Sequence, residues 1–452
     1  MELIAAIATA QIPSAVGIVR LSGEGTRDAL AALFTPANGV VVSDLPYRRM
    51  TYGDVRDETG ALLDRCMAVC FSAAHSYTGE ESAEIHCHGS PVVLGEVLRA
   101  AFRAGARQAR PGEFTQRAFL NGKMDLTEAE AVIDLIDAET ADAAANAAGQ
   151  VAGAMRKRID PVYDSWVDIC AHFHAVLDYP DEDIVPFELS QLESALQASS
   201  RTLSALLSSC HRGRMVRSGV RITILGSPNA GKSSLLNALS GFDRVIVTDI
   251  PGTTRDTVEQ TVTLGRHLVR LVDTAGIRDT EDVIEKIGVD RSVEAAKDCD
   301  AALFVVDDSR PLTDEDRRAM DAALEAPEAI AVLNKQDLGA VIEPSNLPFS
   351  YIVPVSCKDG TGFDLLEQAF DMLFPDDTPC DGSLLTNARQ ADAIVRAKKS
   401  VDAALRSLRA GFTPDAVLVD LEAAMRALGE VTGRTMREDI TNRIFERFCV
   451  GK

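Results

Sequence analysis

The sequence predicts a mixed α/β and α chain: an N-terminal α+β domain, then a helical domain interrupted by an inserted domain with a mostly parallel sheet. Three observations support this prediction. Short apolar runs lie among turn residues near the N-terminus, alanine-rich helical patterns flank the insert, and apolar strands alternate with helices inside it. Such alternation is typical of a mostly parallel sheet. The boundaries expected are 1–120 for the α+β domain, 121–217 and 379–452 for the two helical parts, and 218–378 for the insert.

Length and composition are those of an ordinary globular protein. The chain has 452 residues, of which 46% are hydrophobic and 25% charged. At about 150 residues per domain, this length fits about three domains. No apolar run reaches the roughly 18 residues that a membrane-spanning helix needs. Because Glu2 stands where a secretion signal carries basic residues, we expect a cytoplasmic protein with no membrane contact.

Charge and cysteine content exclude further classes. The net charge of −22 argues against a protein that coats nucleic acid non-specifically, although a local basic patch or a basic partner can still hold one. The nine cysteines are odd in number and include no CxxC pair. They therefore indicate reduced thiols rather than a disulfide framework or a zinc site.

The elements before the insert are predicted from local patterns. Ranges 17–23 and 65–71 are short apolar runs bounded by turn residues, which is typical of strands. Pro91 predicts the first turn of a helix. Further on, Thr127 followed by Glu130 is a capping-box signature ahead of an apolar run. One helical stripe is expected there, formed by Val132, Ile133, Ile136 and Ala143.

The insert and the helices after it show clearer patterns. Five β-rich apolar runs predict strands at 221–225, 268–272, 302–306, 329–333 and 351–355. After about residue 380 the helical texture returns. One stripe is closed by Gly411, and a second helix is predicted to start at Thr413-Pro414.

A glycine-rich motif follows the first strand of the insert. Residues 226–233 read Gly-Ser-Pro-Asn-Ala-Gly-Lys-Ser and precede a helical run, which is the context that the GxxxxGK[ST] phosphate-binding motif requires. Its glycines let backbone N–H groups face a phosphate at a helix N-terminus. Lys232 is predicted to reach the β- and γ-phosphates, and the Ser233 hydroxyl to bind Mg²⁺.

Three further motifs lie in the order and at the spacing of a guanine nucleotide site. Residues 273–276 (Asp-Thr-Ala-Gly) end the second strand, where Asp273 can hold Mg²⁺ through water and Gly276 can contact the γ-phosphate. Asp337 in Asn334-Lys335-Gln336-Asp337 can accept two hydrogen bonds from guanine that adenine does not offer. Residues 356–358 can close over the base. The set resembles the GTPase superfamily and predicts GTP rather than ATP.

The loop 248–256 is interpreted as a switch loop, with Thr254 supplying a second Mg²⁺ hydroxyl. Ile277 follows Gly276 at the place where Ras-like GTPases carry a water-orienting glutamine, and a hydrophobic side chain does not orient water. Either the protein is a poor GTPase or another group does this work. Glu285 is a candidate, although on sequence alone a solvated helix acid is the better interpretation of this residue.

The whole chain resembles the MnmE (TrmE) family of bacterial tRNA-modification GTPases. Beyond the GTPase motifs, the resemblance rests on five stretches, namely Thr78-Gly79-Glu80, His88-Gly89, residues 110–123 (Arg-Pro-Gly-Glu-Phe-Thr-Gln-Arg-Ala-Phe-Leu-Asn-Gly-Lys), residues 125–131 and Phe448-Cys449-Val450-Gly451-Lys452. The long block and the last stretch are highly specific. Two positions depart from the pattern: range 12–16 lacks the family's extra glycines, and Ser90 replaces a second glycine.

The resemblance implies partners and cofactors. Family members act with the FAD-dependent flavoprotein MnmG (GidA), in a heterotetramer, on C5 of wobble uridines in certain tRNAs. They add aminomethyl or carboxymethylaminomethyl groups, with a one-carbon unit from a tetrahydrofolate derivative (the 5-formyl or 5,10-methylene form). The N-terminal domain holds this carrier and forms a homodimer. K⁺ beside the phosphates takes the place of an arginine finger, together with Mg²⁺, so GTP hydrolysis is expected to depend on K⁺.

The resemblance also assigns site residues. The catalytic set is Glu285, which organises water, with Lys232 and Thr254. The K⁺ ligands are Asn229, Thr248, Ile250 and Thr253. The folate contacts are Arg20, Glu84, Lys123 and Lys452. The GTP-binding residues expected from the motifs and the resemblance together are Asn229, Ala230, Gly231, Lys232, Ser233, Ser234, Thr248, Thr253, Thr254, Asp273, Thr274, Ala275, Gly276, Asn334, Lys335, Asp337, Ser356, Cys357 and Lys358.

Several bland alternatives stand beside these assignments. Without the resemblance, Arg20 and Lys123 are solvated surface charges and Glu84 lies on the polar face of a strand. Two further functions compete with the first: a ribosome-assembly GTPase that acts as a binding switch, and a folate-dependent one-carbon enzyme regulated by GTP. The pair His86 and His88 has no third ligand nearby, and His172 and His174 face different ways on a helix. Both pairs are interpreted as structural.

Overall fold

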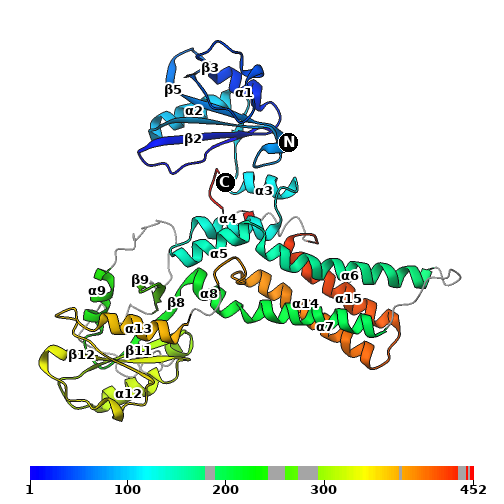
Figure 1. Ribbon diagram of the computed structural model, residues 1–452. Helices are drawn as coiled ribbons and strands as arrows, with labels where there is room; N and C mark the ends of the chain where they lie inside the picture. The colour runs from blue at the N-terminus through cyan, green and yellow to red at the C-terminus, as the bar shows by residue number, and fades with distance from the viewer. Residues whose placement is uncertain are drawn as a thin grey trace. The chain divides into compact units, whose positions relative to one another are not determined.

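The structure, a computed structural model, describes residues 1–178, 189–242, 260–272, 294–375, 379–435, 444–445 and 448–451 (Figure 1). The chain forms two compact units. The first unit comprises Met1–Ile136, Ala147–Ala205 and Arg389–Lys452, and the second comprises Asp137–Asn146 and Leu206–Ala388. Among the helices of the described ranges, none combines the length and the apolar character that a membrane crossing requires. The mixed α/β and α class is confirmed.

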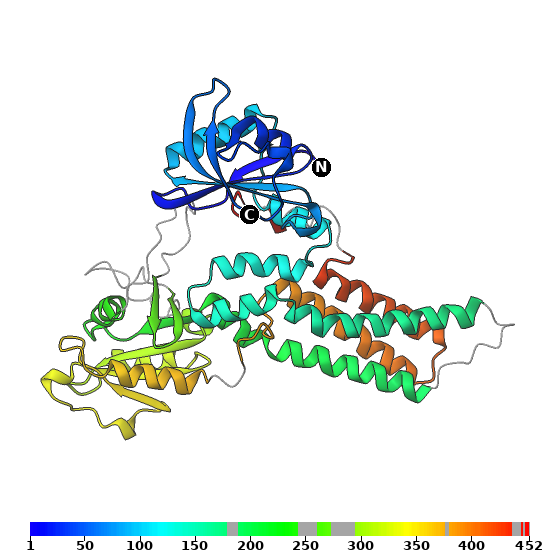
Figure 2. The same cartoon turned by 45° about the horizontal axis from the view of Figure 1, so that its top comes forward.

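The first unit begins with a mostly antiparallel sheet. In the described chain its seven strands are β1 (Ile4–Ile7), β2 (Ser14–Ser22), β3 (Phe34–Pro36), β4 (Thr51–Arg56), β5 (Leu62–Phe71), β6 (Ser82–Gly89) and β7 (Arg107–Gln108), in the order β3-β4-β5-β6-β2-β1-β7. Only β7 pairs in parallel, with β1. Helices α1 (Thr26–Leu33) and α2 (Pro91–Arg103) contact each other and pack against this sheet (Figure 2).

Alternation along the strands explains this packing. On β2, Val19 and Leu21 are fully buried in the core beneath the helices, whereas Arg20 points to the opposite face. Arg20 pairs across the strands with Glu84 of β6, so both charged side chains lie on the face that the helices leave open. The strands predicted at 17–23 and 65–71 are confirmed, as is the helix that starts at Pro91.

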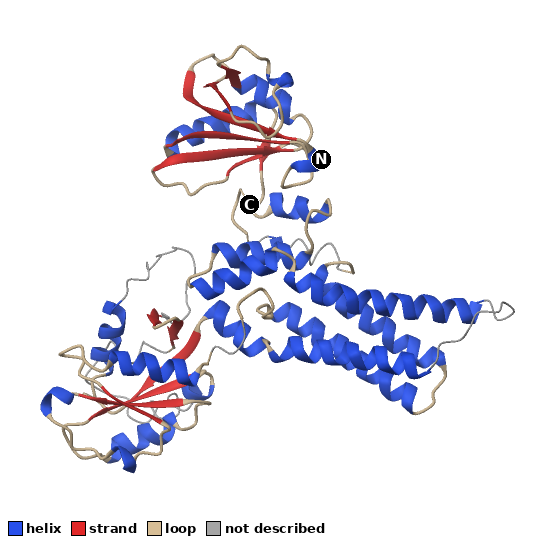
Figure 3. Ribbon diagram, viewed as in Figure 1, coloured by secondary structure: helices blue, strands red, loops and turns tan. Residues whose placement is uncertain are grey.

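The remaining part of the first unit is helical. Its helices are α3 (Glu113–Leu120), α4 (Leu126–Ile136), α5 (Ala141–Val151), α6 (Ala154–Asp178), α7 (Leu189–Ser208), α14 (Ala388–Arg409) and α15 (Pro414–Thr432), some of which continue across the boundary between the units. Figure 3 shows α6, α7, α14 and α15 side by side. The Trp166 indole on α6 donates a hydrogen bond of 3.0 Å to Ser199 on α7, which fixes the contact between these two helices.

Two predictions about the start of this helical part are wrong. The capping box is formed by Asp125 and Glu128, each of which accepts a backbone N–H bond of 2.8 Å from the other. Thr127 is therefore inside α4, and Glu130 is buried against Arg389 and Gln390 of α14. The single stripe expected from Val132 to Ala143 is also divided, because α4 ends at Ile136 and a new helix begins at Ala141.

The second unit contains the mostly parallel sheet. In its described residues the strands are β8 (Val220–Leu225), β9 (Gln260–Leu264), β10 (His267–Leu271), β11 (Ala301–Asp307), β12 (Ala329–Asn334) and β13 (Tyr351–Pro354), in the order β13-β12-β11-β8-β10-β9. The five predicted strands are confirmed and run parallel. The antiparallel edge strand β9 was not predicted. Helices α9 (Lys232–Phe242) and α13 (Phe363–Leu373) pack on one face, and α12 (Asp314–Ala323) on the other; α8 (Cys210–Ser218) precedes β8.

Candidate functional site

The glycine-rich loop connects the end of β8 to the first turn of α9. Gly231 has φ of 100°, and a Cβ there would lie 2.0 Å from the Asn334 side-chain nitrogen, so only glycine fits this position. Asn229 also adopts the left-handed conformation, with φ of 62°, which asparagine tolerates better than most residues. The loop therefore has the tight backbone path that turns N–H groups toward an anion at the start of α9.

Lys232 folds back over this loop. Its ammonium group donates to the carbonyl oxygens of Gly226 and Ser227, at 2.7 and 2.9 Å. Burial lowers the pKa of Lys232, and the charge of Asp316 partly offsets this effect. The two carbonyl contacts are neutral, so a phosphate oxygen offers the ammonium group a stronger, charge-assisted partner. This arrangement fits the predicted role of Lys232.

A buried network holds the loop from below. The Ser227 hydroxyl donates to the fully buried Asp316 carboxylate, which Arg310 also binds, at 2.7 Å. Asp316 in turn forms a capping box with Thr313 at the start of α12. Burial opposes ionisation of Asp316, but hydrogen bonds from Arg310, Ser227 and Thr313 outweigh it and lower its pKa to about 2. Only the Thr-x-x-Asp cap is visible in the sequence; the contact with Ser227 is not.

The residues of the predicted base pocket meet at the ends of β12 and β13. Asn334 donates from its amide to the Ala230 carbonyl at 3.0 Å and so connects the base pocket to the phosphate loop. Ser356 and Lys358 approach the two oxygens of Asp337, at 3.1 and 3.3 Å. Burial raises the pKa of Asp337, but these hydrogen bonds outweigh burial and hold the pKa below its usual value. The carboxylate is therefore a charged acceptor, as guanine recognition requires.

Two other pocket residues have structural partners. The Lys335 ammonium forms an ion pair of 2.7 Å with Asp307 at the end of β11. The backbone N–H of Cys357 donates to the Asn334 side chain at 3.3 Å, and burial raises the pKa of the Cys357 thiol to about 11. This thiol is thus neutral and serves to close the wall of the pocket.

The structure brings together the twelve predicted nucleotide-site residues that it describes, namely Asn229, Ala230, Gly231, Lys232, Ser233, Ser234, Asn334, Lys335, Asp337, Ser356, Cys357 and Lys358. The others lie outside the described residues, namely Thr248, Ile250, Thr253, Thr254, Asp273, Thr274, Ala275, Gly276 and Glu285. The predicted folate contact Lys452 also lies outside them.

Arg20 and Glu84 form the centre of the second predicted site. The Arg20 guanidinium binds one oxygen of Glu84 through two nitrogens, at 2.9 and 2.8 Å. It also lies over the rings of Tyr77 and Phe114, with 5.7 and 5.6 Å to the ring centroids. The bland interpretation of Arg20 as a solvated surface charge is wrong, because both charged side chains are largely buried.

Lys123 and the stretch before Lys452 lie at other edges of the same unit. The exposed Lys123 donates to the Ala74 carbonyl at 2.7 Å, and Gly79 of the Thr-Gly-Glu stretch packs beside it. Val450 pairs with Pro111 in an isolated bridge. Gly451 is so close to Ile7 of β1 that a Cβ would lie 2.3 Å from the Ile7 carbonyl oxygen. The last described residues are thus fixed against the N-terminal sheet.

A further charged network, which the sequence analysis missed, supports this region. Glu113, only 2% exposed, accepts hydrogen bonds from Arg107 and from Arg117, and Arg117 continues to Glu80 at 2.8 Å. Burial raises the pKa of Glu113, but the bonds from Arg107, the Arg110 backbone and Arg117 outweigh it, so that the pKa is lowered to about 2. The network fixes the block 110–123 on which the resemblance rests.

The histidine pairs have carboxylate partners. His86 contacts Glu84 at 3.1 Å, and His174 contacts Glu422 at 3.4 Å. The statement that no third ligand lies near His86 and His88 is wrong for His88, whose ring nitrogen is 2.8 Å from Asp64 on the neighbouring strand. All nine cysteines are free thiols, as predicted.

Comparison with known proteins decides the family. A model of the MnmE helical domain matches residues 126–449, and a model of the N-terminus of the GTP-binding protein TrmE matches residues 3–123. The tRNA modification GTPase MnmE of Roseiflexus sp. (strain RS-1) is 42% identical over 464 residues, which covers 100% of this chain and 99% of the relative. The chain belongs to the MnmE family of tRNA modification GTPases.

Other MnmE relatives match as completely. MnmE of Thermoanaerobacter sp. (strain X514) is 39% identical over 458 residues, with 100% of this chain and 99% of the relative covered. MnmE of Synechococcus sp. (strain JA-2-3B'a(2-13)) is 41% identical and covers 100% and 98%. The resemblance stated from residues 110–123 and the last stretch is thereby confirmed. Both N-terminal and helical regions match, so membership of the family does not rest on the nucleotide motifs alone.

Proposed function

We propose that this chain is the GTP-hydrolysing component of a system that adds aminomethyl or carboxymethylaminomethyl groups to C5 of wobble uridine in certain tRNAs. The observation that carries the proposal is the full-length match to MnmE relatives at about 40% identity, together with a phosphate loop and a guanine-selective Asp337 joined through Asn334. The one-carbon unit comes from a tetrahydrofolate derivative, and the partners are tRNA, an FAD-dependent MnmG-type flavoprotein and a second copy of this chain, all in the cytoplasm.

In the second unit, residues 218–378 form the proposed GTPase domain between the helical parts 121–217 and 379–452. Ser233, at the start of α9, and Thr254 would hold Mg²⁺, which offsets phosphate charge when bound. Asn229 would hold K⁺ with Thr248, Ile250 and Thr253. The exposed, left-handed Asn229 supports this role, because its amide oxygen stands at the outer edge of the phosphate loop.

The chain's own residues divide the work of hydrolysis. Lys232 exchanges its two carbonyl partners for phosphate oxygens and so stabilises charge that develops there. Ser227, held by Asp316, keeps the loop in the shape that aims its N–H groups. Asp337 fixes the base. Glu285 would orient the attacking water, since Ile277 offers no polar group.

In the first unit, residues 1–120 form the proposed folate-binding and dimerisation domain. The Arg20–Glu84 pair offers a donor and an acceptor side by side, next to the Tyr77 and Phe114 rings. This combination suits a flat heterocycle with hydrogen-bonding edges, such as the pterin of a folate. Lys123 and Lys452 would bind the carboxylates of the carrier.

The proposal is tested by mass spectrometry of tRNA nucleosides from a strain that lacks this protein. We expect the C5-modified wobble uridines to disappear and to return when the wild-type gene is restored. Restoration with the Lys232→Ala variant should fail, because that variant loses phosphate binding but keeps the first unit. Normal wobble uridines in the deletion strain would overturn the proposal and favour a ribosome-assembly GTPase instead.

A further inference from the structure

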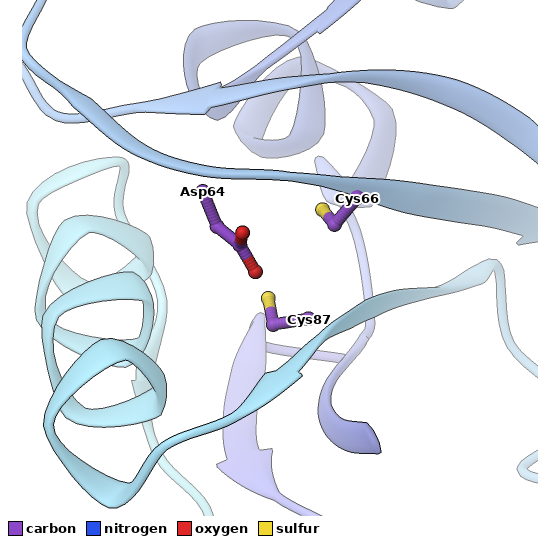
Figure 4. A group of neighbouring side chains, drawn as sticks. All are labelled: Asp64, Cys66 and Cys87. Atoms are coloured by element: carbon purple, nitrogen blue, oxygen red, sulfur yellow. The ribbon is translucent and has the colours of Figure 1, made fainter. Parts of the chain in front are cut away.

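Two cysteines and an aspartate meet on neighbouring strands of the N-terminal sheet. Asp64 and Cys66 lie on β5, and Cys87 lies on β6. Figure 4 shows the three side chains pointing toward one another. Their potential ligand atoms all lie within 4.8 Å of one another, and this is the one such group of three among the residues that the structure describes. The group is far from the nucleotide motifs in the sequence and contains no predicted folate contact.

Burial and charge distinguish this cluster from ordinary core packing. Cys66 and Cys87 are 5% and 2% exposed, and the Asp64 side chain is 10% exposed. Thiols alone are common in a core because they behave as small apolar groups. A carboxylate beside two thiols is not explained in this way, since burying its charge costs free energy unless a counter-charge or hydrogen bonds offset the cost.

The Asp64 carboxylate is oriented by its neighbours but not saturated. One oxygen accepts the His88 ring at 2.8 Å and the Arg65 backbone N–H at 2.7 Å, and the other accepts the His88 backbone N–H at 2.8 Å. A carboxylate has about four acceptor positions, so one remains on the second oxygen. Hydrogen bonds of this kind are typical of the supporting groups around a metal ligand.

We propose that Asp64, Cys66 and Cys87 bind a thiophilic divalent cation, with Zn²⁺ the best match, and that His88 positions the carboxylate. Two thiolates and one carboxylate suit a borderline-soft ion with tetrahedral preference. With Zn–S near 2.3 Å and Zn–O near 2.1 Å, neighbouring ligand atoms lie roughly 3 to 4 Å apart. The three side chains therefore close on an ion with movements of about 1 Å, and the fourth position is left to solvent.

The proposed site also has an entry path and a matched internal control. The His88 side chain is 76% exposed, so the carboxylate side of the cluster faces solvent. Cys70 lies four residues after Cys66 on β5, points to the same face and is 1% exposed, but it is not in the cluster. A cysteine substitution at position 70 thus reproduces the change in the core without removing a proposed ligand.

The test titrates the full-length chain with Co²⁺, in a phosphine reductant and after removal of bound metal. We expect thiolate-to-cobalt charge-transfer absorption at one Co²⁺ per chain, displaced by Zn²⁺, and a rise in the Tm of the wild type with Zn²⁺. Cys66→Ser and Cys87→Ser should lose the band, and Cys70→Ser should keep it. Asp64→Asn, which leaves both thiols in place, should weaken affinity about tenfold or more, as should His88→Ala.

Three outcomes would overturn the proposal. The first is no charge-transfer band in the wild type, and the second is a band that persists in Cys66→Ser. The third is a Cys66–Cys87 disulfide found by peptide mass spectrometry under the same reducing conditions, because it would remove both ligands. If a cysteine variant fails to fold, as shown by circular dichroism, the wild type and Asp64→Asn still decide.

Discussion

The two predicted sites are built in different ways. The nucleotide site of the second unit is mainly backbone: one loop, the first turn of α9 and two strand ends, each given by a short contiguous motif. The site around Arg20 in the first unit is mainly side chains, gathered from β2, β6, the loop at Tyr77 and α3. A site made from contiguous backbone can be derived from residues and spacing, whereas one assembled from scattered side chains was assigned only through family resemblance.

The ionic state of the two sites differs as well. Lys232 has only neutral carbonyl partners, which a phosphate readily replaces. Arg20 already has a carboxylate partner, Glu84, on the neighbouring strand. A ligand at Arg20 must therefore share this pair rather than displace it. We expect charge substitutions to affect ligand affinity in the second unit and both affinity and local stability in the first.

The largest effect is expected at Asp337. In Asp337→Asn, the guanine edge loses two charge-assisted hydrogen bonds, so GTP affinity should fall by roughly a hundredfold or more. Binding of xanthosine triphosphate should improve, because a carboxamide can donate to the xanthine oxygen. Equilibrium binding of both nucleotides measures the effect. Unchanged GTP affinity would remove Asp337 from the base pocket.

The Glu113 network predicts a pH-dependent effect on stability in the first unit. Its pKa is about 2 in the folded chain and 4.5 without the fold, so its ionised form contributes about 3 kcal/mol to the free energy of unfolding above pH 4.5. This contribution is lost as pH falls toward 2. Denaturation of wild type and Glu113→Gln should therefore differ by about this amount at pH 7 and much less near pH 2.5.

Glu2 provides the matched control for Glu113. Its carboxylate also binds Arg107, but it is 67% exposed. Glu2→Gln should change the free energy of unfolding by under about 1 kcal/mol at either pH, because exposed ion pairs contribute little. An equal effect of the two substitutions would mean that burial does not set the strength of the network.

Asn229 tests the proposed K⁺ site. We expect hydrolysis by the wild type to be about tenfold or more faster in K⁺ than in Na⁺, because a correctly coordinated cation offsets developing phosphate charge. Asn229→Ala should lose most of this difference and retain GTP binding. Rates measured at equal ionic strength in the two salts decide. Equal wild-type rates in K⁺ and Na⁺ would contradict the site.

The smallest effect is expected at Ser227. Ser227→Ala removes one hydrogen bond to Asp316, while Arg310 and Thr313 keep the carboxylate satisfied. GTP affinity should fall several-fold, as expected for one hydrogen bond to a charged group. Asp316→Asn should cost more, since it weakens three contacts at once. If Ser227→Ala is the more harmful of the two, the loop is not held through Asp316.

The sequence predicted elements whose signal is local. The apolar runs at 302–306 and 329–333 became β11 and β12 because buried parallel strands are apolar on both faces. The edge strand β9 was missed, since Gln-Thr-Val-Thr-Leu lacks such a run. The capping box was misplaced because the two signatures overlap. Burial of Glu130 against Arg389, which is distant in sequence, decided between them.

The same distinction holds for the sites. Lys232, Asn334 and Asp337 could be predicted because their spacing fixes their chemistry. The contact between Ser227 and Asp316 joins residues 89 positions apart. Cys66 and Cys87 come together only through the pairing of β5 with β6. No local pattern contains either relation.

The central claim is that two separate sites in one chain serve one modification. The stretch 449–452 tests it most directly, because the Gly112 backbone N–H donates to the Cys449 carbonyl at 3.3 Å and Gly451 contacts Ile7, all within the first unit. We would delete 449–452 and measure tRNA modification and GTP hydrolysis together, with the flavoprotein partner present. The account predicts that modification is lost while GTP hydrolysis stays nearly intact. Full modification by the truncated chain would contradict it, and parallel loss of both activities would refute the separation of the two sites.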